Sequence, residues 1–153
     1  MESRENNGPY NIYAETEFSI EFYDVDPMGV AWHGHYIKYF ELGRRSLLEK
    51  IGYYYHEMKN AECVFPVIEV SVKYLNPLKF IDRARIKTIL MEYENRLKIK
   101  YEIRNAETGV LTTKGMSTQM AFDLKTGESC FICPADLTGK VEALIEIMKN
   151  EKL

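Results

Sequence analysis

The sequence predicts an α+β fold in which one curved antiparallel sheet packs against a single long helix. Apolar residues recur at helical spacing across residues 35–51, and they alternate with polar residues in the segments before and after that stretch. The segments after the helix are separated by short turns, which join antiparallel strands. A sheet with one apolar face needs a cover, and the helix over residues 35–51 is the candidate.

The first strand is expected over residues 13–23, YAETEFSIEFY. Phe18, Ile20 and Phe22 alternate there with glutamate and serine, which is the two-residue period of a half-buried strand. The segment DVDPMG, residues 24–29, then breaks the strand, because proline lacks an amide N–H and glycine readily adopts positive φ.

The long helix is expected to begin at Gly34 or His35 and to end at Ile51. Its apolar residues share one face, and Gly52 is a natural C-terminal stop. Gly43 costs stability inside a helix, so its presence indicates a close approach between the helix and the sheet. The residues of the apolar face are Tyr36, Phe40, Leu47, Leu48 and Ile51.

The remaining chain alternates between strand-like segments and turns and ends in a helix. Successive strands are expected to be antiparallel neighbours, because turns such as AETG (106–109) are short. The segment GYYYHEMKNAEC (52–63) can hold a short second helix. The expected strands cover residues 65–75, 82–94, 96–105 and 110–124, and the final helix covers residues 134–150.

Length and charge are those of an ordinary globular protein. The 153 residues fit one domain, expected over residues 13–150, after a disordered lead-in over residues 1–12. The net charge of −3 and the pI near 5.7 give no reason to expect a nucleic-acid partner. No run of about 18 apolar residues is present, so no transmembrane segment is expected, and the polar start is unlike a secretory signal.

The three cysteines, Cys63, Cys130 and Cys133, favour a reducing compartment, and a cytoplasmic location is expected. CFIC, residues 130–133, has the C-x-x-C spacing. A structural zinc site needs four ligands, and no second such pair exists, so no metal site is expected. The two cysteines of this motif are interpreted as small apolar side chains in a strand or loop.

The segment FYDVDPMGVAWHGHYIKYFELGRR, residues 22–45, places two aspartates, a tight turn and two histidines directly before the long helix. It resembles the N-terminal signature of hotdog-fold acyl-CoA thioesterases of the 4-hydroxybenzoyl-CoA thioesterase type. VSVKYLNPLKFIDRARI, residues 70–86, resembles the second strand of that family and the turn after it, and the resemblance covers residues 17–140. It implies a hotdog fold, in which the sheet wraps around the long helix.

The resemblance also implies a function: hydrolysis of an acyl-CoA to free CoA and a carboxylic acid, without a cofactor. It implies that Asp26 supplies the catalytic carboxylate, as nucleophile or as general base. The backbone N–H of His33, beside the positive end of the helix, would polarise the thioester carbonyl. Active sites of the family form between two subunits, so a homo-oligomer, a dimer or a tetramer, is expected. The substrate-binding candidates are Gly29, Val30, Trp32 and Tyr36.

Other interpretations of these residues stay open. Asp24 is expected to bond to nearby backbone amides, and Asp26 can be a similar turn residue. His33 and His35 form an H-x-H pair, but positions two apart do not share a helix face, which disfavours a metal site. The two aromatic candidates can be plain core residues beside a helix start.

Two rival functions also stay open. An acyl carrier protein thioesterase has the same chemistry and a different carrier. A non-catalytic acyl-binding module keeps the fold, but it does not need a carboxylate such as Asp26 beside an oxyanion donor.

Coenzyme A carries phosphates, so its binding site is expected to have a basic rim. The available basic residues are Lys73, Arg83, Arg85, Lys98 and Lys114.

Overall fold

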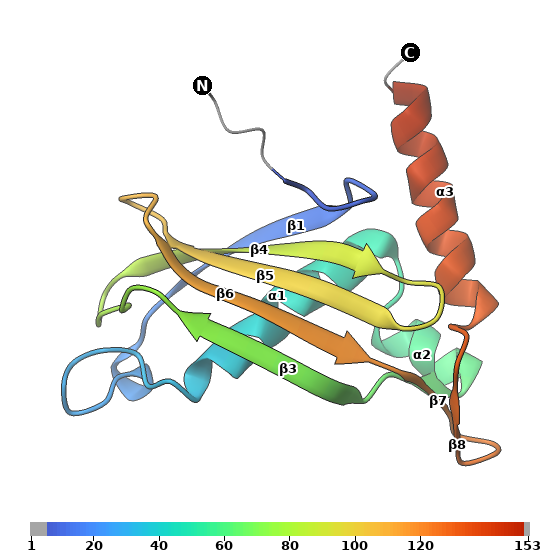
Figure 1. Cartoon of the computed structure of the whole chain (residues 1–153), viewed down its shortest axis with the longest axis horizontal. Helices are drawn as coiled ribbons and strands as arrows, with labels where there is room; N and C mark the ends of the chain where they lie inside the picture. Colours follow the sequence, from blue (N-terminus) through green and yellow to red (C-terminus); the bar gives the residue numbers. More distant parts are fainter. Residues whose placement is uncertain (1–5, 152–153) are drawn as a thin grey trace.

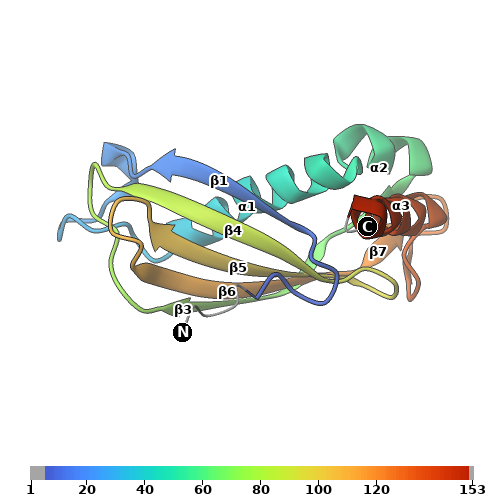
Figure 2. The same ribbon diagram turned by 90° about the horizontal axis from the view of Figure 1, so that it is seen from above.

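The computed structural model describes residues 6–151 and has the predicted α+β architecture. A five-stranded antiparallel sheet in the order β1-β4-β5-β6-β3 curves around one long helix, and a small sheet in the order β2-β7-β8 lies at one end (Figure 1, Figure 2). The elements are β1 (Tyr13–Ser19), the 3-10 helix η1 (Phe22–Asp24), α1 (His35–Ile51), α2 (Tyr55–Ala61), β2 (Cys63–Val64), β3 (Val67–Tyr74), β4 (Arg83–Glu92), β5 (Leu97–Asn105), β6 (Leu111–Gln119), β7 (Ala121–Asp123), β8 (Glu128–Cys130) and α3 (Ala135–Glu151).

The helix α1 covers the concave face of the large sheet. It begins at His35 and ends at Ile51, which confirms the predicted bounds. Gly52 adopts φ of 85°, and its N–H caps the last turn through the carbonyls of Leu48 and Glu49. The buried residues of α1 are Tyr36, Tyr39, Phe40, Gly43, Leu47, Leu48 and Ile51.

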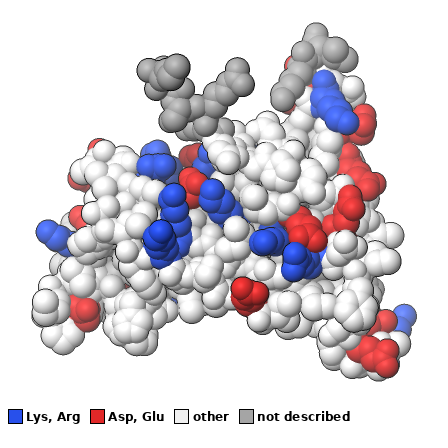
Figure 3. Space-filling view, in the orientation of Figure 1, with Lys and Arg blue, Asp and Glu red and all other residues white. Residues whose placement is uncertain are grey.

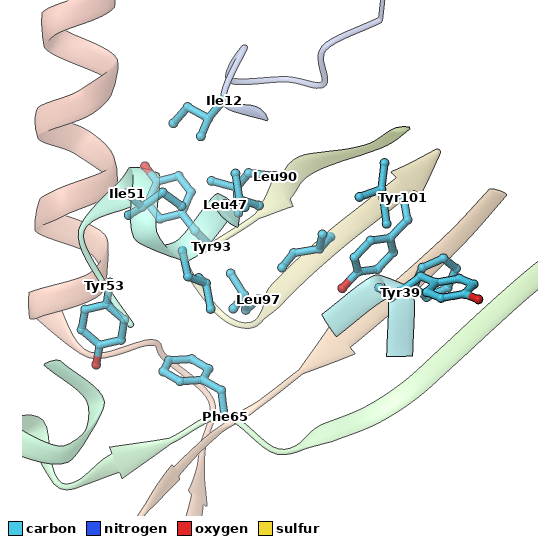
Figure 4. Packing of buried hydrophobic residues seen from close by; sticks show 14 of the residues in the cluster. Ile12, Tyr39, Leu47, Ile51, Tyr53, Phe65, Leu90, Tyr93, Leu97 and Tyr101 are labelled. Carbon is cyan, nitrogen blue, oxygen red and sulfur yellow. The ribbon is translucent and has the colours of Figure 1, made fainter. Parts of the chain in front are cut away.

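The strands present their apolar residues to α1. In β5, alternate residues are fully buried against the helix and the residues between them face outward. Tyr101 of β5 stacks on Phe40 of α1 with ring centroids 4.2 Å apart, and its hydroxyl bonds to that of Ser117 on β6 (2.7 Å). Figure 4 shows Tyr101 at one end of the core, which continues to Tyr53 and Phe65 beside the small sheet.

The pairing of β3 differs from the expected one. We expected β3 to lie beside β4, but β3 pairs with β6, and β4 pairs with β1 and β5. The link between them, residues 75–82, is not a tight turn. It bonds instead to the segment that precedes α1: the Ala31 N–H donates to the carbonyl of the buried Leu78 (2.7 Å). The link therefore crosses the sheet end and leaves β3 at the far edge.

Two strands are shorter than expected. The first one ends at Ser19, and η1 follows, so Phe22 is 77% exposed instead of lying in a strand. The expected strand over residues 110–124 breaks at Met120 into β6 and β7, and β7 pairs with β2 and β8 in the small sheet. Neither break coincides with a glycine or a proline, so the sequence carried no signal for it.

The predictions of the other two helices are confirmed. The segment 52–63 holds the short helix α2, and α3 begins one residue after the expected start of the final helix. Figure 1 shows α3 extending beyond the end of the sheet. Within residues 6–151, no helix is long and apolar enough to cross a membrane.

Residues 6–12, the described part of the predicted lead-in, lie along β4. Ile12 is fully buried, and its carbonyl accepts the Leu90 N–H (3.0 Å). Gly8, at φ of 77°, lies against the side chain of Ile89. Residues 1–5 of the lead-in lie outside the described residues.

Gly43 lets α1 approach the sheet. A Cβ at this position would overlap Oγ1 of Thr88 and would lie 3.0 Å from Cδ1 of Ile86, both on β4. Thr88 and Ile86 are fully buried, so neither can move aside without disturbing the core. The close approach that this glycine predicted is confirmed.

Replacing Gly43 by alanine should destabilise the protein, although alanine is the better helix former. The added methyl group overpacks the interface with β4, which costs about 1–3 kcal/mol of unfolding free energy. Urea titration followed by circular dichroism measures the loss. Gly139 of α3 is the matched control, because a Cβ there meets no atom within 4 Å. Gly139→Ala should add roughly 0.5–1 kcal/mol, and equal effects of the two substitutions would contradict the close approach.

Candidate active site

Asp24 holds both ends of the loop that precedes α1. Its side chain is buried, and its Oδ2 accepts the Glu21 N–H (2.9 Å), while its main-chain carbonyl accepts the Trp32 N–H (2.9 Å). The loop of residues 25–31 therefore closes on one residue at its base, in agreement with the backbone-bonding role expected for Asp24. Burial, followed by the neighbouring Asp24 carboxylate, raises the pKa of the Tyr39 phenol.

Asp26 lies at the turn of this loop, half-buried. Its Oδ1 accepts the Met28 N–H (2.9 Å) and, at longer range, the Val30 N–H (3.4 Å). Gly29 completes the turn at φ of 80°. The other carboxylate oxygen of Asp26, Oδ2, has no hydrogen-bond or ion-pair partner within residues 6–151. Asp26 is therefore a turn residue that also has an uncommitted carboxylate oxygen, one without a hydrogen-bond partner.

The first amide N–H after the loop that lacks a hydrogen-bond acceptor is that of His33. All the amide N–H groups of residues 28–32 donate hydrogen bonds inside the loop or to the β3–β4 link. The His35 N–H donates to the Trp32 carbonyl (2.9 Å), whereas the N–H groups of His33 and Gly34 have no acceptor in the described chain. Because these amides lie at the N-terminal end of α1, the helix dipole adds positive potential there.

A cavity of about 340 Å³ is lined by both residues that carry these groups, Asp26 and His33. Of the candidates from the sequence, Asp26, Val30, His33 and Tyr36 line it, whereas Gly29 and Trp32 lie outside the lining. Burial raises the pKa of Tyr36, so its phenol stays protonated at neutral pH. The remaining lining residues are Ala31, Tyr74, Leu75, Asn76 and Pro77.

Trp32 folds back over the start of α1 and is 48% exposed. Its ring centroid lies 4.9 Å from that of His33 and 5.5 Å from that of His35. A Cβ on Gly34 would overlap the indole ring, so glycine is needed there for the ring to lie flat against the backbone. The tryptophan covers the helix start from outside the cavity.

The segment 74–77 was missed by sequence reasoning and forms one wall of the cavity. The Tyr74 hydroxyl donates to the His33 carbonyl (2.7 Å), and its ring lies edge-to-face on Tyr36 with centroids 5.0 Å apart. The one signal in the sequence was Asn76-Pro77, which marks a chain reversal. It does not say toward which part of the chain the reversal leads.

Within residues 6–151, no group of three or more His, Cys, Asp or Glu side chains is arranged to hold a metal ion. The three cysteines are free thiols, with Cys63 and Cys133 buried and Cys130 at the end of β8. Burial, followed by the Cys63 thiol, raises the pKa of Cys133 to about 12, so this thiol stays protonated at neutral pH.

The basic residues considered for a coenzyme A rim lie on the face of the sheet that points away from α1. Arg83 and Arg85 pair there with Glu17 of β1, at 3.0 and 2.7 Å, and Lys73 lies opposite Lys114. Figure 3 views this face and shows its Lys and Arg side chains interleaved with acidic ones. The alternation along the strands therefore separates these side chains from the cavity that holds Asp26.

Solved structures define the fold class. A DHNA-CoA thioesterase from Staphylococcus aureus is 27% identical, covers 92% of this chain and 95% of its own, and superposes with a TM-score of 0.76. A variant of 4-hydroxybenzoyl-CoA thioesterase, in complex with 4-hydroxybenzoyl-CoA, is 16% identical over 85% of this chain and 99% of its own, with a TM-score of 0.75. The second likeness concerns the fold alone. Together with the helix wrapped by the sheet, they define a hotdog fold.

The family follows from the sequence comparison. The model of the thioesterase-like superfamily matches residues 20–143, so the chain belongs to that superfamily and is a hydrolase of the thioesterase family. YneP of Bacillus subtilis strain 168, which carries the name putative acyl-CoA thioesterase, is 26% identical over 111 residues, 72% of this chain and 80% of its own. The chloroplastic acyl-acyl carrier protein thioesterase ATL3 of Arabidopsis thaliana is 32% identical over 78 residues, 48% of this chain and 41% of its own.

Replacing Gly34 by alanine should expel the indole ring from the start of α1. Trp32 is the only tryptophan, so its fluorescence reports this event directly. We expect a red-shifted emission maximum and stronger acrylamide quenching than in the wild type, because the new Cβ occupies the space of the ring. Gly139→Ala serves as the control and should leave both signals unchanged. An unchanged spectrum for Gly34→Ala would contradict the packing of Trp32 on the backbone.

Proposed function

We propose that this protein hydrolyses the thioester bond of an acyl-CoA, releasing free CoA and a carboxylic acid. The observation that carries the proposal is the cavity lined by both Asp26, which has an uncommitted carboxylate oxygen, and His33, which has an uncommitted N–H. Thioester hydrolysis needs a group that attacks or activates water and a donor for the developing oxyanion. The names of YneP and of the S. aureus structure support CoA thioesters as substrates. The three cysteines are free thiols, which persist in a reducing compartment, and this supports a cytoplasmic location.

Asp26 supplies the carboxylate chemistry in this proposal. In one route it attacks the carbonyl carbon, the C–S bond breaks, and water then hydrolyses the mixed anhydride. In the other route it takes a proton from water as the water attacks. Both routes consume one water, restore the carboxylate and release CoA as the protonated thiol. The bond from Met28 to Oδ1 holds the carboxylate in place and leaves Oδ2 for the reaction.

The His33 N–H stabilises the oxyanion that forms when the carbonyl carbon becomes tetrahedral. A backbone donor at a helix N-terminus suits this task, because its direction is fixed and the helix dipole favours negative charge. The proposal assigns a role only to the backbone N–H of His33, and the reaction as proposed needs no metal ion or other cofactor. Val30 and Tyr36 contribute the apolar wall against which the acyl group binds.

Asp26→Asn should lower the rate of thiol release by roughly 10²–10⁴-fold. The amide oxygen of asparagine can still accept the Met28 N–H, so the turn survives while the charge is lost. The assay follows free thiol with a chromogenic reagent on acetyl-, hexanoyl-, palmitoyl-, benzoyl- and 4-hydroxybenzoyl-CoA. Circular dichroism checks that the variant is folded.

Asp123 provides the matched control for this substitution. Its Oδ1 also accepts a backbone N–H two residues on, from Lys125 (2.8 Å), but in the β7–β8 hairpin far from the cavity. Asp123→Asn should keep the wild-type rate. Full activity of a folded Asp26→Asn variant would exclude the assigned role, whatever the substrate.

An acyl carrier protein thioesterase is the second candidate function, because ATL3 carries that name. The same acyl group presented on CoA and on a carrier protein separates the two. A higher kcat/KM for the CoA ester supports the leading proposal, and a higher value for the protein-bound ester supports the second. A wild type that binds but cleaves neither is a non-catalytic acyl-binding module.

The edge strand β3 supports a homo-oligomer with the active site at the subunit interface. Within the described sheet β3 has one neighbour, β6, so its other edge offers free backbone groups. Val67, Ile68 and Val70 are exposed along it, an arrangement that soluble proteins avoid unless another strand covers it. Pairing of β3 with its copy about a two-fold axis places each partner beside the wall formed by residues 74–77. The resulting assembly is a dimer, or a tetramer of two such dimers.

Val70→Lys should weaken this assembly. Two lysines brought together across the two-fold axis repel each other, which should raise the dimer dissociation constant by at least about tenfold. Sedimentation velocity across a concentration series measures the change. Ile147→Lys, at an exposed isoleucine of α3 away from β3, should have no effect. A wild type that sediments as a monomer at micromolar concentration would rule out the interface.

A further inference from the structure

We propose that Tyr74 is a positioning residue that aims the oxyanion donor of His33 by holding the neighbouring carbonyl. The inference rests on the proposed thioesterase function. The Tyr74 hydroxyl donates to the His33 carbonyl at 2.7 Å, across 41 positions of sequence. Tyr74 does not touch the reacting atoms in this proposal and acts through the backbone of His33.

The His33 N–H lies in the same peptide plane as the Trp32 carbonyl, and the His33 Cα atom is one end of that plane. The preceding plane contains the Trp32 carbonyl, which accepts the His35 N–H at 2.9 Å. The following plane contains the His33 carbonyl, which accepts the Tyr74 hydroxyl. The first bond sets the rotation of the plane that carries the His33 N–H, and the second holds the Cα atom at the end of that plane. Together they fix where the His33 N–H lies and where it points.

Nothing else in the described chain holds the second plane. Gly34 is the N-cap of α1 and offers no side chain to cap the helix, so the start of α1 lacks its usual anchor. The Gly34 N–H, which shares that plane with the His33 carbonyl, has no acceptor within residues 6–151. The bond from Tyr74 therefore anchors the helix start to the edge strand, although it leaves the free N–H groups of the helix N-terminus uncapped.

The hydrogen bond is not needed to bury the tyrosine. Tyr74 is 49% exposed, so water could satisfy its hydroxyl. Its ring is held independently by the edge-to-face contact with Tyr36, whose centroid is 5.0 Å away. Tyr74→Phe should therefore keep the fold and the cavity wall while it frees the His33 carbonyl.

The kinetic test compares Tyr74→Phe with the wild type on the acyl-CoA that the wild type hydrolyses fastest. We expect kcat to fall by roughly ten- to a hundredfold, less than the loss of a whole oxyanion donor, because the donor is misaimed and not removed. KM should change by less than about twofold, since the lost bond acts only on the transition state. Tyr55→Phe, at an exposed tyrosine of α2, is the control and should match the wild type.

A second measurement reads the backbone without any substrate. In NMR spectra of the labelled protein, Tyr74→Phe should shift the His33 carbonyl resonance and broaden the amide signals of His33 and Gly34. Tyr55→Phe should leave all three signals in place. Loss of packing alone would instead disturb Tyr36 and the strand β3 and would spare these signals.

The outcomes separate this inference from the proposed function. An unchanged kcat, or a raised KM at constant kcat, overturns the positioning role of Tyr74 while thioester hydrolysis stands. A wild type inert on every acyl ester removes the proposed function, and the NMR comparison then decides alone. Unchanged His33 and Gly34 signals in Tyr74→Phe overturn the inference in every case.

Discussion

The depth at which α1 lies against the sheet fixes the positions of all the parts around it. Two glycines set this depth, one on each side of the interface. Gly43 brings the helix backbone against Thr88 of β4, and Gly115 leaves room on β6 for the Phe40 ring, which then stacks on Tyr101. A methyl group at either glycine would lift the helix off the sheet. Because a close-packed interior cannot absorb such a shift, the start of α1 has one position relative to the strands.

That position determines the candidate site. The loop of residues 25–31 ends at the helix start, and it is fastened at its base by Asp24 and along its side by the β3–β4 link. The amides of residues 28–32 are all used, so the next free donors along the chain occur where the helix dipole is most positive. The edge strand then adds Tyr74 on the other side of the cavity. Two segments distant in sequence thus meet at one helix terminus: the loop that leads into α1, and the end of β3 with the link that follows it.

Much of this could be predicted from the sequence, and the limits have physical causes. The bounds of α1 follow from a periodic apolar face and from Gly52, both of which are local signals. The alternation of residues in β3 shows which side chains share a face, but not which strand lies beside it, so its pairing with β6 was not foreseen. The backbone bonds of Asp24 are local as well. Tyr74 was missed because its partner is a main-chain carbonyl, which has no signature in the sequence.

The pairing of β3 with β6 has a consequence for biosynthesis. The ribosome releases Asp26 and His33 early, but in the large sheet β3 has β6 as its neighbour, and Val67 of β3 lies opposite Gln119. Pairings between residues so distant in sequence form late, because a long loop must close first. A nascent chain that has released the whole aspartate loop therefore still lacks the wall around Tyr74. The cavity forms only when most of the polypeptide has left the exit tunnel. The thioester hydrolysis that we propose can therefore begin only once the sheet is complete.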